Sequence, residues 1–343
     1  RLDILVPLAL PPAELKADLL KQLRAPALAT LAARARLAQT ESFDGFPHAL
    51  PHEYWITRRA GLHAPADNSP AVAGAWMHAH DIAAEEGTWF ALHPVHIHIA
   101  RDHLVLTDPQ QLDLSDADSR TLFDIARPLF EEYGHALHYG NATTWFMRAD
   151  QWQGLRTSTP EAAAGHNVDL WLPRGPGERD WRRLQNEVQM HWFTHPLNEA
   201  REARGARPVN SLWLWGAAQP APPPRAPWQA AFNLGRWPYA APGIPMSHAT
   251  DASTLLAQRP EHVLLALDAL IDPAIAGDWG DWLAALEALE RDWFAPLLEA
   301  LRSGSIDEIT LVPTGEGHLK EFVIRPSSLR KFWVRPSLNP LFA

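Results

Sequence analysis

Histidines gather in two short stretches of the sequence, MHAHD at 77–81 and HPVHIHIARDH at 93–103. In the second stretch, one residue separates His96 from His98, and polar and apolar residues alternate, which predicts a β-strand with both histidines on one face. Two histidines placed in this way have the geometry to hold zinc or another transition metal. The commoner role of such residues is hydrogen bonding within a polar sheet face. A metal hydrolase that uses His96 and His98 is therefore one hypothesis.

Carboxylates are frequent in the segment 277–304, where apolar residues recur at helical spacing. This periodicity predicts a long amphipathic helix whose acidic residues form its solvated face rather than a catalytic group. The chain has no phosphate-binding loop of the Gly-x-x-x-x-Gly-Lys type, no Gly-x-Ser-x-Gly elbow and no His-Glu-x-x-His zinc motif. The acidic residues of the segment include Asp278, Asp281, Glu287, Glu290 and Asp292.

Composition excludes several classes of function. The 343 residues carry a formal net charge of −10, which argues against nucleic acid or an anionic membrane as the main partner. There is no cysteine, so disulfides, thiolate zinc sites and cysteine nucleophiles are excluded. The first apolar run ends at Pro11-Pro12, too early for a membrane span, and has no signal-peptide pattern, so we expect a cytoplasmic protein. The 16 tryptophans are expected in cores or interfaces.

Apolar runs alternate with helical patterns along the chain, which is typical of an α/β fold with a mostly parallel sheet covered by helices on both faces. Residues 88–150 form an exception, because they read as a small α+β unit of their own. We therefore expect a core made of 1–87 and 151–343 with an inserted domain at 88–150. The main expected strands are 1–8, 209–216, 261–267, 309–313 and 322–326, and the first expected helices are 12–24 and 27–39.

One segment, LNEAREARGARPVNSLWLWG at 197–216, resembles a known family. It is similar to the Asn-x-x-Arg, Gly-x-x-Pro-x-Asn and Trp-Gly signature of the archaeal-type cofactor-independent phosphoglycerate mutases. The resemblance implies the fold of the alkaline phosphatase superfamily, to which those enzymes belong, with a small inserted α+β domain. The matching positions are Asn198, Arg201, Gly205, Pro208, Asn210, Trp215 and Gly216.

The chain departs from that family where the family binds metal. The first strand reads ILVPLAL and lacks the family's aspartate. His52 stands in place of the nucleophilic serine, with Glu53 in place of the adjacent acid. Asp272 is kept, but Ala276 replaces its histidine, and Gly315-Glu316 replace a late Asp-His pair. A two-metal phosphoryl transfer needs several such ligands around both ions, so their loss is typical of a pseudoenzyme.

The resemblance therefore implies two hypotheses. In the first, the protein is a non-catalytic, bacterial, phosphoglycerate-mutase-related or Rpf-type regulatory protein that binds a protein partner or a small phosphorylated ligand and needs no cofactor. In the second, it is a metal-dependent phosphatase or mutase in which His52 accepts phosphate, with Mn or Zn as its metal. The residues assigned to these roles are His52 and Glu53 in catalysis, Arg58, Arg59, Asn198, Arg201 and Asn210 in ligand binding, and Asp272, Glu316, His96 and His98 as metal ligands.

Overall fold

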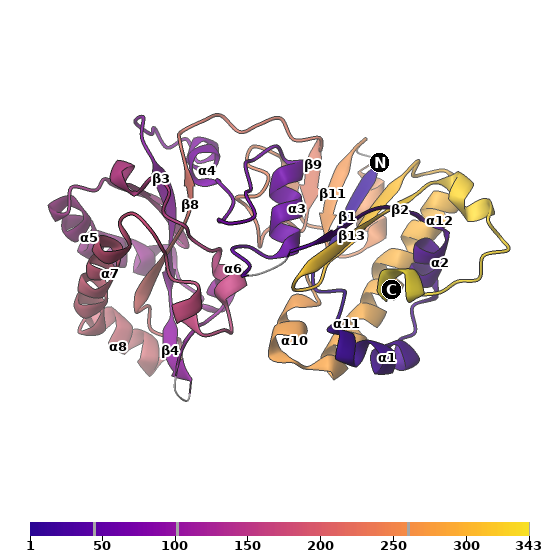
Figure 1. Ribbon diagram of the computed structural model, residues 1–343, viewed down its shortest axis with the longest axis horizontal. Helices are drawn as coiled ribbons and strands as arrows, with labels where there is room; N and C mark the ends of the chain where they lie inside the picture. The colour runs from indigo at the N-terminus through magenta and orange to yellow at the C-terminus, as the bar shows by residue number, and fades with distance from the viewer. Residues whose placement is uncertain (44–45, 101–102, 259–260, 343) are drawn as a thin grey trace. The chain divides into compact units, whose positions relative to one another are not determined.

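The chain forms two compact units in a computed structural model that describes residues 1–43, 46–100, 103–258 and 261–342. The first unit consists of Arg1–Gly45, Ala226–Pro238 and Ile244–Ala343, and the second of Phe46–Arg225 and Tyr239–Gly243 (Figure 1). No helix of the described residues is long and apolar enough to cross a bilayer.

The first unit contains a seven-stranded mixed sheet in the order β10-β9-β11-β1-β12-β13-β2. The strands from β10 to β12 run parallel, whereas β13 and β2 are antiparallel to their neighbours. β1 lies between β11 and β12, so all five of its residues are buried, as expected for a central parallel strand. The strands are β1 (Leu2–Val6), β2 (Arg36–Ser42), β9 (Ala230–Phe232), β10 (Met246–Ser247), β11 (Val263–Ala266), β12 (Ile309–Pro313) and β13 (His318–Ile324).

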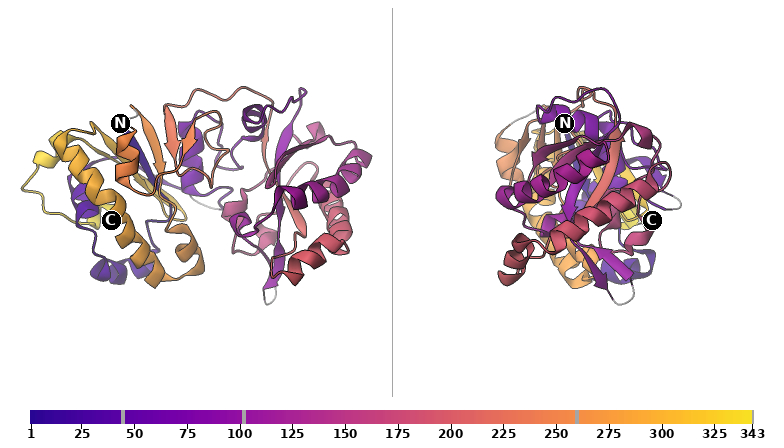
Figure 2. Two further views of the ribbon diagram at one scale, coloured as in Figure 1. Left: turned by 180° about the vertical axis from the view of Figure 1, so that it is seen from behind. Right: turned by 90° about the vertical axis from the view of Figure 1, so that its left-hand side faces the viewer.

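Helices pack along this sheet, and α11 and α12 continue into one another as a single long rod in the left view of Figure 2. A π-helical turn at Glu290–Phe294 joins them. It places the buried Glu290 carboxylate where it accepts the N–H groups of Ala27 and Leu28, at 2.6 and 3.0 Å, and so caps α2. The helices are α1 (Ala13–Gln22), α2 (Pro26–Arg34), α9 (Ala252–Ala257), α10 (Ile271–Ala276), α11 (Trp279–Leu289), α12 (Ala295–Ser303) and α13 (Asn339–Phe342), with a 3-10 turn at Pro326–Arg330.

The second unit is built on a four-stranded antiparallel sheet in the order β6-β7-β3-β8, with a separate β4-β5 hairpin. Apolar residues of α5 and α7 pack with the sheet residues in one buried cluster rich in tryptophan. Its strands are β3 (Trp89–Val95), β4 (Ile97–Ala100), β5 (His103–Leu106), β6 (Leu137–Asn141), β7 (Thr144–Arg148) and β8 (Ser211–Ala218). Its helices are α3 (Pro51–Arg59), α4 (Ala73–Ala79), α5 (Asp116–Glu132), α6 (Pro160–Ala163), α7 (Glu178–Phe193) and α8 (Pro196–Ala203), with 3-10 turns at Pro109–Gln111, Asp150–Trp152 and Val168–Leu170.

The predicted α/β class, with a mostly parallel sheet and a smaller second sheet, is confirmed. The strand expected at 209–216 is confirmed as β8, Ser211–Ala218, although it pairs with β3 of the antiparallel sheet rather than with the main sheet. One element prediction was wrong. The helix expected at 27–39 ends at Arg34, and Arg36–Ser42 forms the edge strand β2 because its backbone pairs with β13. The second unit, Phe46–Arg225 with Tyr239–Gly243, extends beyond 88–150 on both sides.

Candidate functional site

Ligands of open α/β sheets bind at the carboxyl ends of the parallel strands, so this edge of the first unit is the first place to search. At the centre of the edge, β1 runs into Pro7 and Leu8 and supplies no acid. Leu8 has a φ of 52°, which is unusual for a residue other than glycine. Its N–H donates to Thr314 Oγ1 at 3.3 Å, and its carbonyl accepts the indole N–H of Trp282 at 2.9 Å. Buried apolar residues and their hydrogen bonds therefore close the middle of the edge.

The one acid of β1 lies at the other end of the strand. Asp3 is buried, accepts the indole N–H of Trp228 at 2.8 Å and lies 3.2 Å from Nε2 of His262. This carboxylate stands near the amino end of β1, so it is not the metal ligand that the family resemblance implied after the first strand.

Asp272 and Glu316 are both exposed and follow β11 and β12, the strands on either side of β1. Asp272 lies in the first turn of α10, after β11, and Oδ1 is 3.6 Å from Nη1 of Arg236. Glu316 lies in the turn between β12 and β13. Within the described ranges, no group of three or more His, Asp or Glu side chains has an arrangement that could hold a metal ion. The metal roles of both acids stay predictions.

A cleft of about 470 Å³ opens beside the ends of β9, β10 and β11. We call it the edge cleft. Its polar residues include Arg236, whose side chain is only 9% exposed, the exposed His248 and the half-buried Asp268. The residues that line it are Asn233, Gly235, Arg236, His248, Ala249, Thr250, Ala266, Leu267, Asp268, Ala269, Leu289 and Trp293.

The walls of the edge cleft are held by an asparagine that joins two loops. Asn233 has a φ of 57°, a left-handed conformation that asparagine tolerates better than most residues. Its side chain donates to the carbonyl of Ala249 at 2.9 Å and accepts the Ala249 N–H at 3.0 Å. The loops after β9 and β10 are therefore fixed to one another, and the cleft between them is a built feature.

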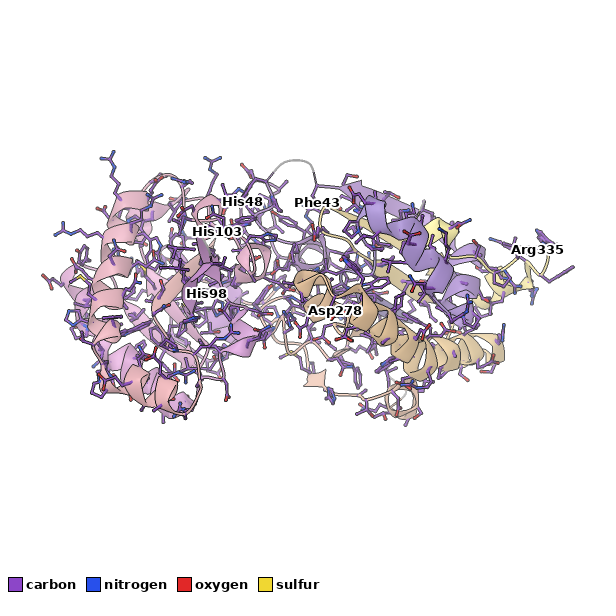
Figure 3. The ribbon with its side chains drawn as sticks, turned by 90° about the horizontal axis from the view of Figure 1, so that it is seen from below. Phe43, His48, His98, His103, Asp278 and Arg335 are labelled. Carbon is purple, nitrogen blue, oxygen red and sulfur yellow. The ribbon has the colours of Figure 1, made fainter. Side chains whose placement is uncertain are left out.

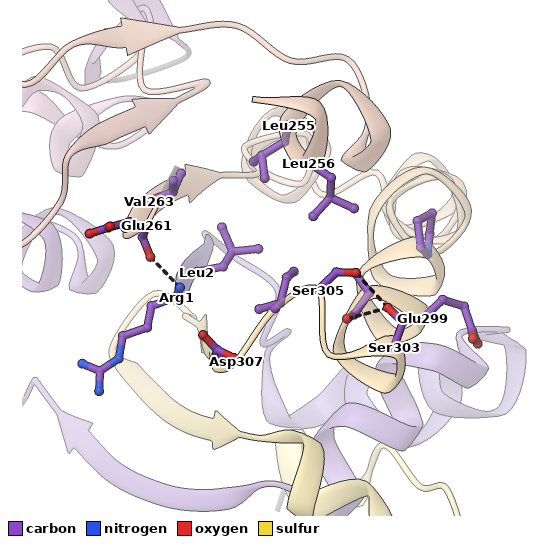
Figure 4. A pocket seen from close by; sticks show the side chains of 13 residues that line it. Arg1, Leu2, Leu255, Leu256, Glu261, Val263, Glu299, Ser303, Ser305 and Asp307 are labelled. Carbon is purple, nitrogen blue, oxygen red and sulfur yellow. Dashed lines mark hydrogen bonds between the residues drawn. The ribbon is translucent and has the colours of Figure 1, made fainter. Parts of the chain in front are cut away.

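A larger cavity, of about 770 Å³, lies at the opposite edge of the same sheet (Figure 4). Its apolar floor includes Leu2, at the start of β1, and Val263, at the start of β11. Its rim carries the carboxylates of Glu261, Glu299 and Asp307. It is at the amino edge, and its carboxylates repel an anion, so the edge cleft is the better candidate for an anionic ligand despite its smaller volume.

The second unit contains a group of buried polar side chains that we call the buried acid cluster: His52, Glu53, Thr159, Glu161 and Tyr239. The first turn of α3 contributes His52 and Glu53, both 0% exposed. Glu53 Oε2 accepts the Leu50 N–H at 2.8 Å and the Thr159 hydroxyl at 2.7 Å, and Oε1 accepts the Tyr239 hydroxyl. Burial, together with the nearby Glu161 carboxylate, raises the pKa of Glu53 to about 7.

His52 is placed for a structural role within this cluster. Its Nε2 lies 3.2 Å from Oε1 of Glu161, which is itself only 9% exposed. Because the imidazole is fully buried, a phosphoryl donor has no path to it in this structure. Arg58 and Arg59 lie in the last turn of α3, roughly 9 Å further along the helix axis. The Arg58 guanidinium stacks over the Tyr54 ring and donates to the Ala64 carbonyl, so it is directed away from His52.

The three remaining residues assigned to ligand binding hold the backbone of the second unit. The Asn198 amide donates to the carbonyls of Trp192 and Val209 and accepts the Val209 N–H. Asn210 makes a matching pair of hydrogen bonds with Ile97. Arg201 is 0% exposed and donates to three backbone carbonyls and to Asp118. These contacts account for the three side chains as architecture, and ligand binding by them stays a prediction.

His96 and His98 do share a face, as the sequence predicts, because their rings stack with centroids 5.7 Å apart and planes 12° apart. Nδ1 of His96 is 2.8 Å from the Pro208 carbonyl, and Nδ1 of His98 is 3.4 Å from the Thr107 hydroxyl. Burial lowers the pKa of His96. Figure 3 labels His98 with His103, which lies on the paired strand of the same hairpin.

The sequence analysis did not identify most of the polar residues that line the edge cleft or form the buried acid cluster. Arg236, His248 and Asp268 belong to three segments that come together only through the pairing of β9, β10 and β11. Only Thr159 had a local signal that could have been used, since threonine before proline is a common start of a helix, and Thr159 accepts the Ala162 N–H at the start of α6. That signal gives no indication that α6 faces α3.

Comparison with known proteins finds distant relatives. A probable 2,3-bisphosphoglycerate-independent phosphoglycerate mutase of Geobacter sulfurreducens is 25% identical over 148 residues, 42% of this chain and 35% of the relative. A 2,3-bisphosphoglycerate-independent phosphoglycerate mutase of Methanosarcina mazei is 26% identical over 213 residues, 58% of this chain and 49% of the relative. The matches thus span between about a third and a half of the length of these curated relatives. No protein-family model matches the chain.

A cofactor-independent phosphoglycerate mutase of Thermoplasma acidophilum is similar in structure, with a TM-score of 0.46 and 14% sequence identity over 94% of this chain and 89% of that one. The sequence matches make the chain a distant homologue of the archaeal-type cofactor-independent phosphoglycerate mutases of the alkaline phosphatase superfamily.

Proposed function

We propose that this phosphoglycerate-mutase-like protein binds a small phosphorylated carboxylate in the edge cleft and does not turn it over. The observation that carries the proposal is the nearly buried Arg236 side chain, 9% exposed, in a cleft of about 470 Å³ at the carboxyl edge of the sheet. A planar guanidinium binds phosphate or carboxylate through two parallel hydrogen bonds, and these are stronger where water is partly excluded.

The polar residues of the edge cleft support an anion that also carries hydroxyl groups. His248 adds a second donor at the exposed side of the cleft. The Asp268 carboxylate can accept hydrogen bonds from ligand hydroxyls, and the Thr250 hydroxyl can accept from them or donate to them. Leu267 and Trp293 provide apolar contact for the carbon skeleton. The related proteins are named as phosphoglycerate mutases, and phosphoglycerates combine phosphate, carboxylate and hydroxyl, which is why we name this class of ligand.

The absence of turnover is inferred from the chain's own strand ends. In a two-metal site, carboxylates and histidines must converge on both ions to stabilise the attacking and leaving oxygens. Here the first strand, ILVPLAL, lacks the expected acid, and Ala276 and Gly315 stand where two further ligands are expected from the family resemblance. The buried acid cluster offers no substitute, since His52 has no access to solvent.

The proposal is tested by titrating 3-phosphoglycerate into the purified protein by calorimetry and by assaying mutase activity with added manganese. We expect binding without turnover, and we expect Arg236→Gln to weaken binding by about tenfold to a hundredfold, as the loss of charged hydrogen bonds does. Arg302→Gln, which removes an ion-paired arginine of α12 outside the cleft, is the matched control and should bind like the wild type. Manganese-dependent turnover would show that the protein is an enzyme, and equal binding by Arg236→Gln would place the ligand elsewhere.

A further inference from the structure

One tryptophan differs from all the others in the chain. The sequence has 16 tryptophans, all within the described residues, and Trp333 alone is exposed, at 69%. Its neighbour Phe332 is 81% exposed, and the two rings lie edge to face with centroids 5.1 Å apart. An adjacent pair of exposed aromatic rings is costly in water unless something covers it. We call the segment that carries them, Arg330–Arg335, the aromatic-basic turn.

The aromatic-basic turn is a built structure. Its backbone closes on itself, with the Phe332 N–H donating to the Arg330 carbonyl at 2.8 Å and the Val334 N–H to the Lys331 carbonyl at 2.9 Å. Two hydrogen bonds fix it to the end of α2, from Arg34 Nη1 to the Leu329 carbonyl and from Lys331 Nζ to the Arg34 carbonyl. The chain then returns to the core through α13, where Leu341 and Phe342 are buried. The two rings are thus presented outward by a turn anchored on both sides.

Positive charge surrounds the two rings. Arg330, Lys331 and Arg335 lie within three residues of them, and Figure 3 shows Arg335 on a loop that projects from the first unit. No residue from 325 to 343 is acidic, although the whole chain carries a net charge of −10. Cationic side chains around exposed aromatic rings match a surface that is negatively charged outside and apolar beneath. An anionic lipid bilayer has this profile, and tryptophan is enriched at its interface.

We propose that the aromatic-basic turn docks the protein on anionic membrane surfaces. Phe332 and Trp333 enter the headgroup region, while the exposed Arg330 and Arg335 contact lipid phosphates and carboxylates. The acidic remainder of the chain opposes this only weakly at physiological salt, because charges more than about 8 Å from the surface are largely screened. The edge-to-face rings do not offer two parallel faces for stacked bases, so single-stranded nucleic acid fits the turn less well.

Sedimentation of the full chain with phosphatidylcholine vesicles, with and without phosphatidylserine, tests the proposal. We expect the wild type to sediment with the phosphatidylserine vesicles only, and less so as salt rises. The double variant Phe332→Ala/Trp333→Ala should lose about tenfold in apparent affinity, as should the double variant Arg330→Gln/Arg335→Gln. Because Arg330, Phe332, Trp333 and Arg335 are exposed, both variants should keep the circular dichroism spectrum of the wild type.

Phe193→Ala is the matched control, since Phe193 is an aromatic residue of α7 that is 78% exposed and has no neighbouring arginine or lysine. This variant should bind vesicles like the wild type. The proposal is overturned if the wild type fails to sediment with anionic vesicles at low salt. It is also overturned if Phe332→Ala/Trp333→Ala binds these vesicles as well as the wild type does. It is also overturned if the same substitutions abolish self-association or RNA binding while vesicle binding is absent.

Discussion

The buried acid cluster of the second unit and the edge cleft of the first unit each contain a histidine, a threonine and a carboxylate, yet the surroundings of these polar side chains differ. In the cluster, Glu53 is 0% exposed and accepts hydrogen bonds from a backbone N–H and two hydroxyls. In the cleft, Arg236 faces a space of about 470 Å³ bordered by the exposed His248. Side chains whose hydrogen bonds are satisfied by protein stabilise the fold, whereas those that line a solvent-filled space can bind a ligand. Residue type alone does not distinguish the two.

Removing the central carboxylate of the buried acid cluster should have the largest effect. Glu53→Ala leaves the Leu50 N–H and the hydroxyls of Thr159 and Tyr239 without their acceptor in the interior. We expect the free energy of unfolding to fall by about 3–5 kcal/mol, measured by urea denaturation followed by circular dichroism. Glu316→Ala, at an exposed turn of the first unit, is the control and should stay within about 0.5 kcal/mol of the wild type. Equal losses in the two variants would contradict the structural role of the cluster.

The burial of Glu53 should also make the stability of the protein depend on pH. The pKa of Glu53 rises from 4.5 to about 7 on folding, because burial and Glu161 disfavour its charge. Between these two values the native state keeps a proton that the unfolded state releases, so the free energy of unfolding falls as pH rises through this window. The total decrease is roughly 3 kcal/mol at most.

Glu53→Gln is isosteric and cannot release a proton, so it should flatten this dependence. Urea denaturation of the wild type and of Glu53→Gln between pH 4.5 and about 7 measures this. Most of the difference between their free energies of unfolding should appear as the pH approaches 7. A variant that keeps the slope of the wild type would show that another group titrates. Above the window, the glutamine variant should be the more stable of the two.

The smallest effect concerns the edge cleft. Asp272 is 67% exposed and pairs with Arg236 at 3.6 Å, an interaction of the surface type that is worth roughly 0.2–1 kcal/mol. If Asp272 competes with an anionic ligand for the guanidinium, Asp272→Asn should raise the affinity for 3-phosphoglycerate by about twofold to fivefold. Calorimetry in the presence of a chelator measures this. A different result would identify Asp272 as a metal ligand: both proteins fail to bind 3-phosphoglycerate in the chelator, and added manganese restores binding to the wild type but not to Asp272→Asn.

Much of the fold could be predicted from local patterns. The apolar runs at 261–267 and 309–313 form β11 and β12, and the amphipathic segment 277–304 forms α11 and α12. Pro196 divides the helical pattern around it, so that α7 ends at Phe193 and α8 begins at Pro196. These elements were predictable because the periodicity of apolar residues and the backbone limits of proline act over a few residues.

The candidate sites were less predictable. His52 and Glu53 stood out by their position in the family resemblance, but the sequence gives no sign that Tyr239 and Glu161 enclose them. Arg236 carried no motif at all. Its environment depends on Asp272, 36 positions later in the chain. Such contacts are made by the packing of distant segments, which no local pattern reports.

The sequence by itself determined which segments are apolar, where prolines and glycines end helices, and that the chain lacks cysteine and carries net negative charge. Tertiary structure alone decided that 209–216 pairs with β3, that His52 is closed off from solvent, and that Arg236 lines a cleft. The physical reason is that an apolar run specifies that a strand is buried without specifying its partner. Burial and pairing, in turn, decide whether a polar side chain supports the fold or is open to a ligand.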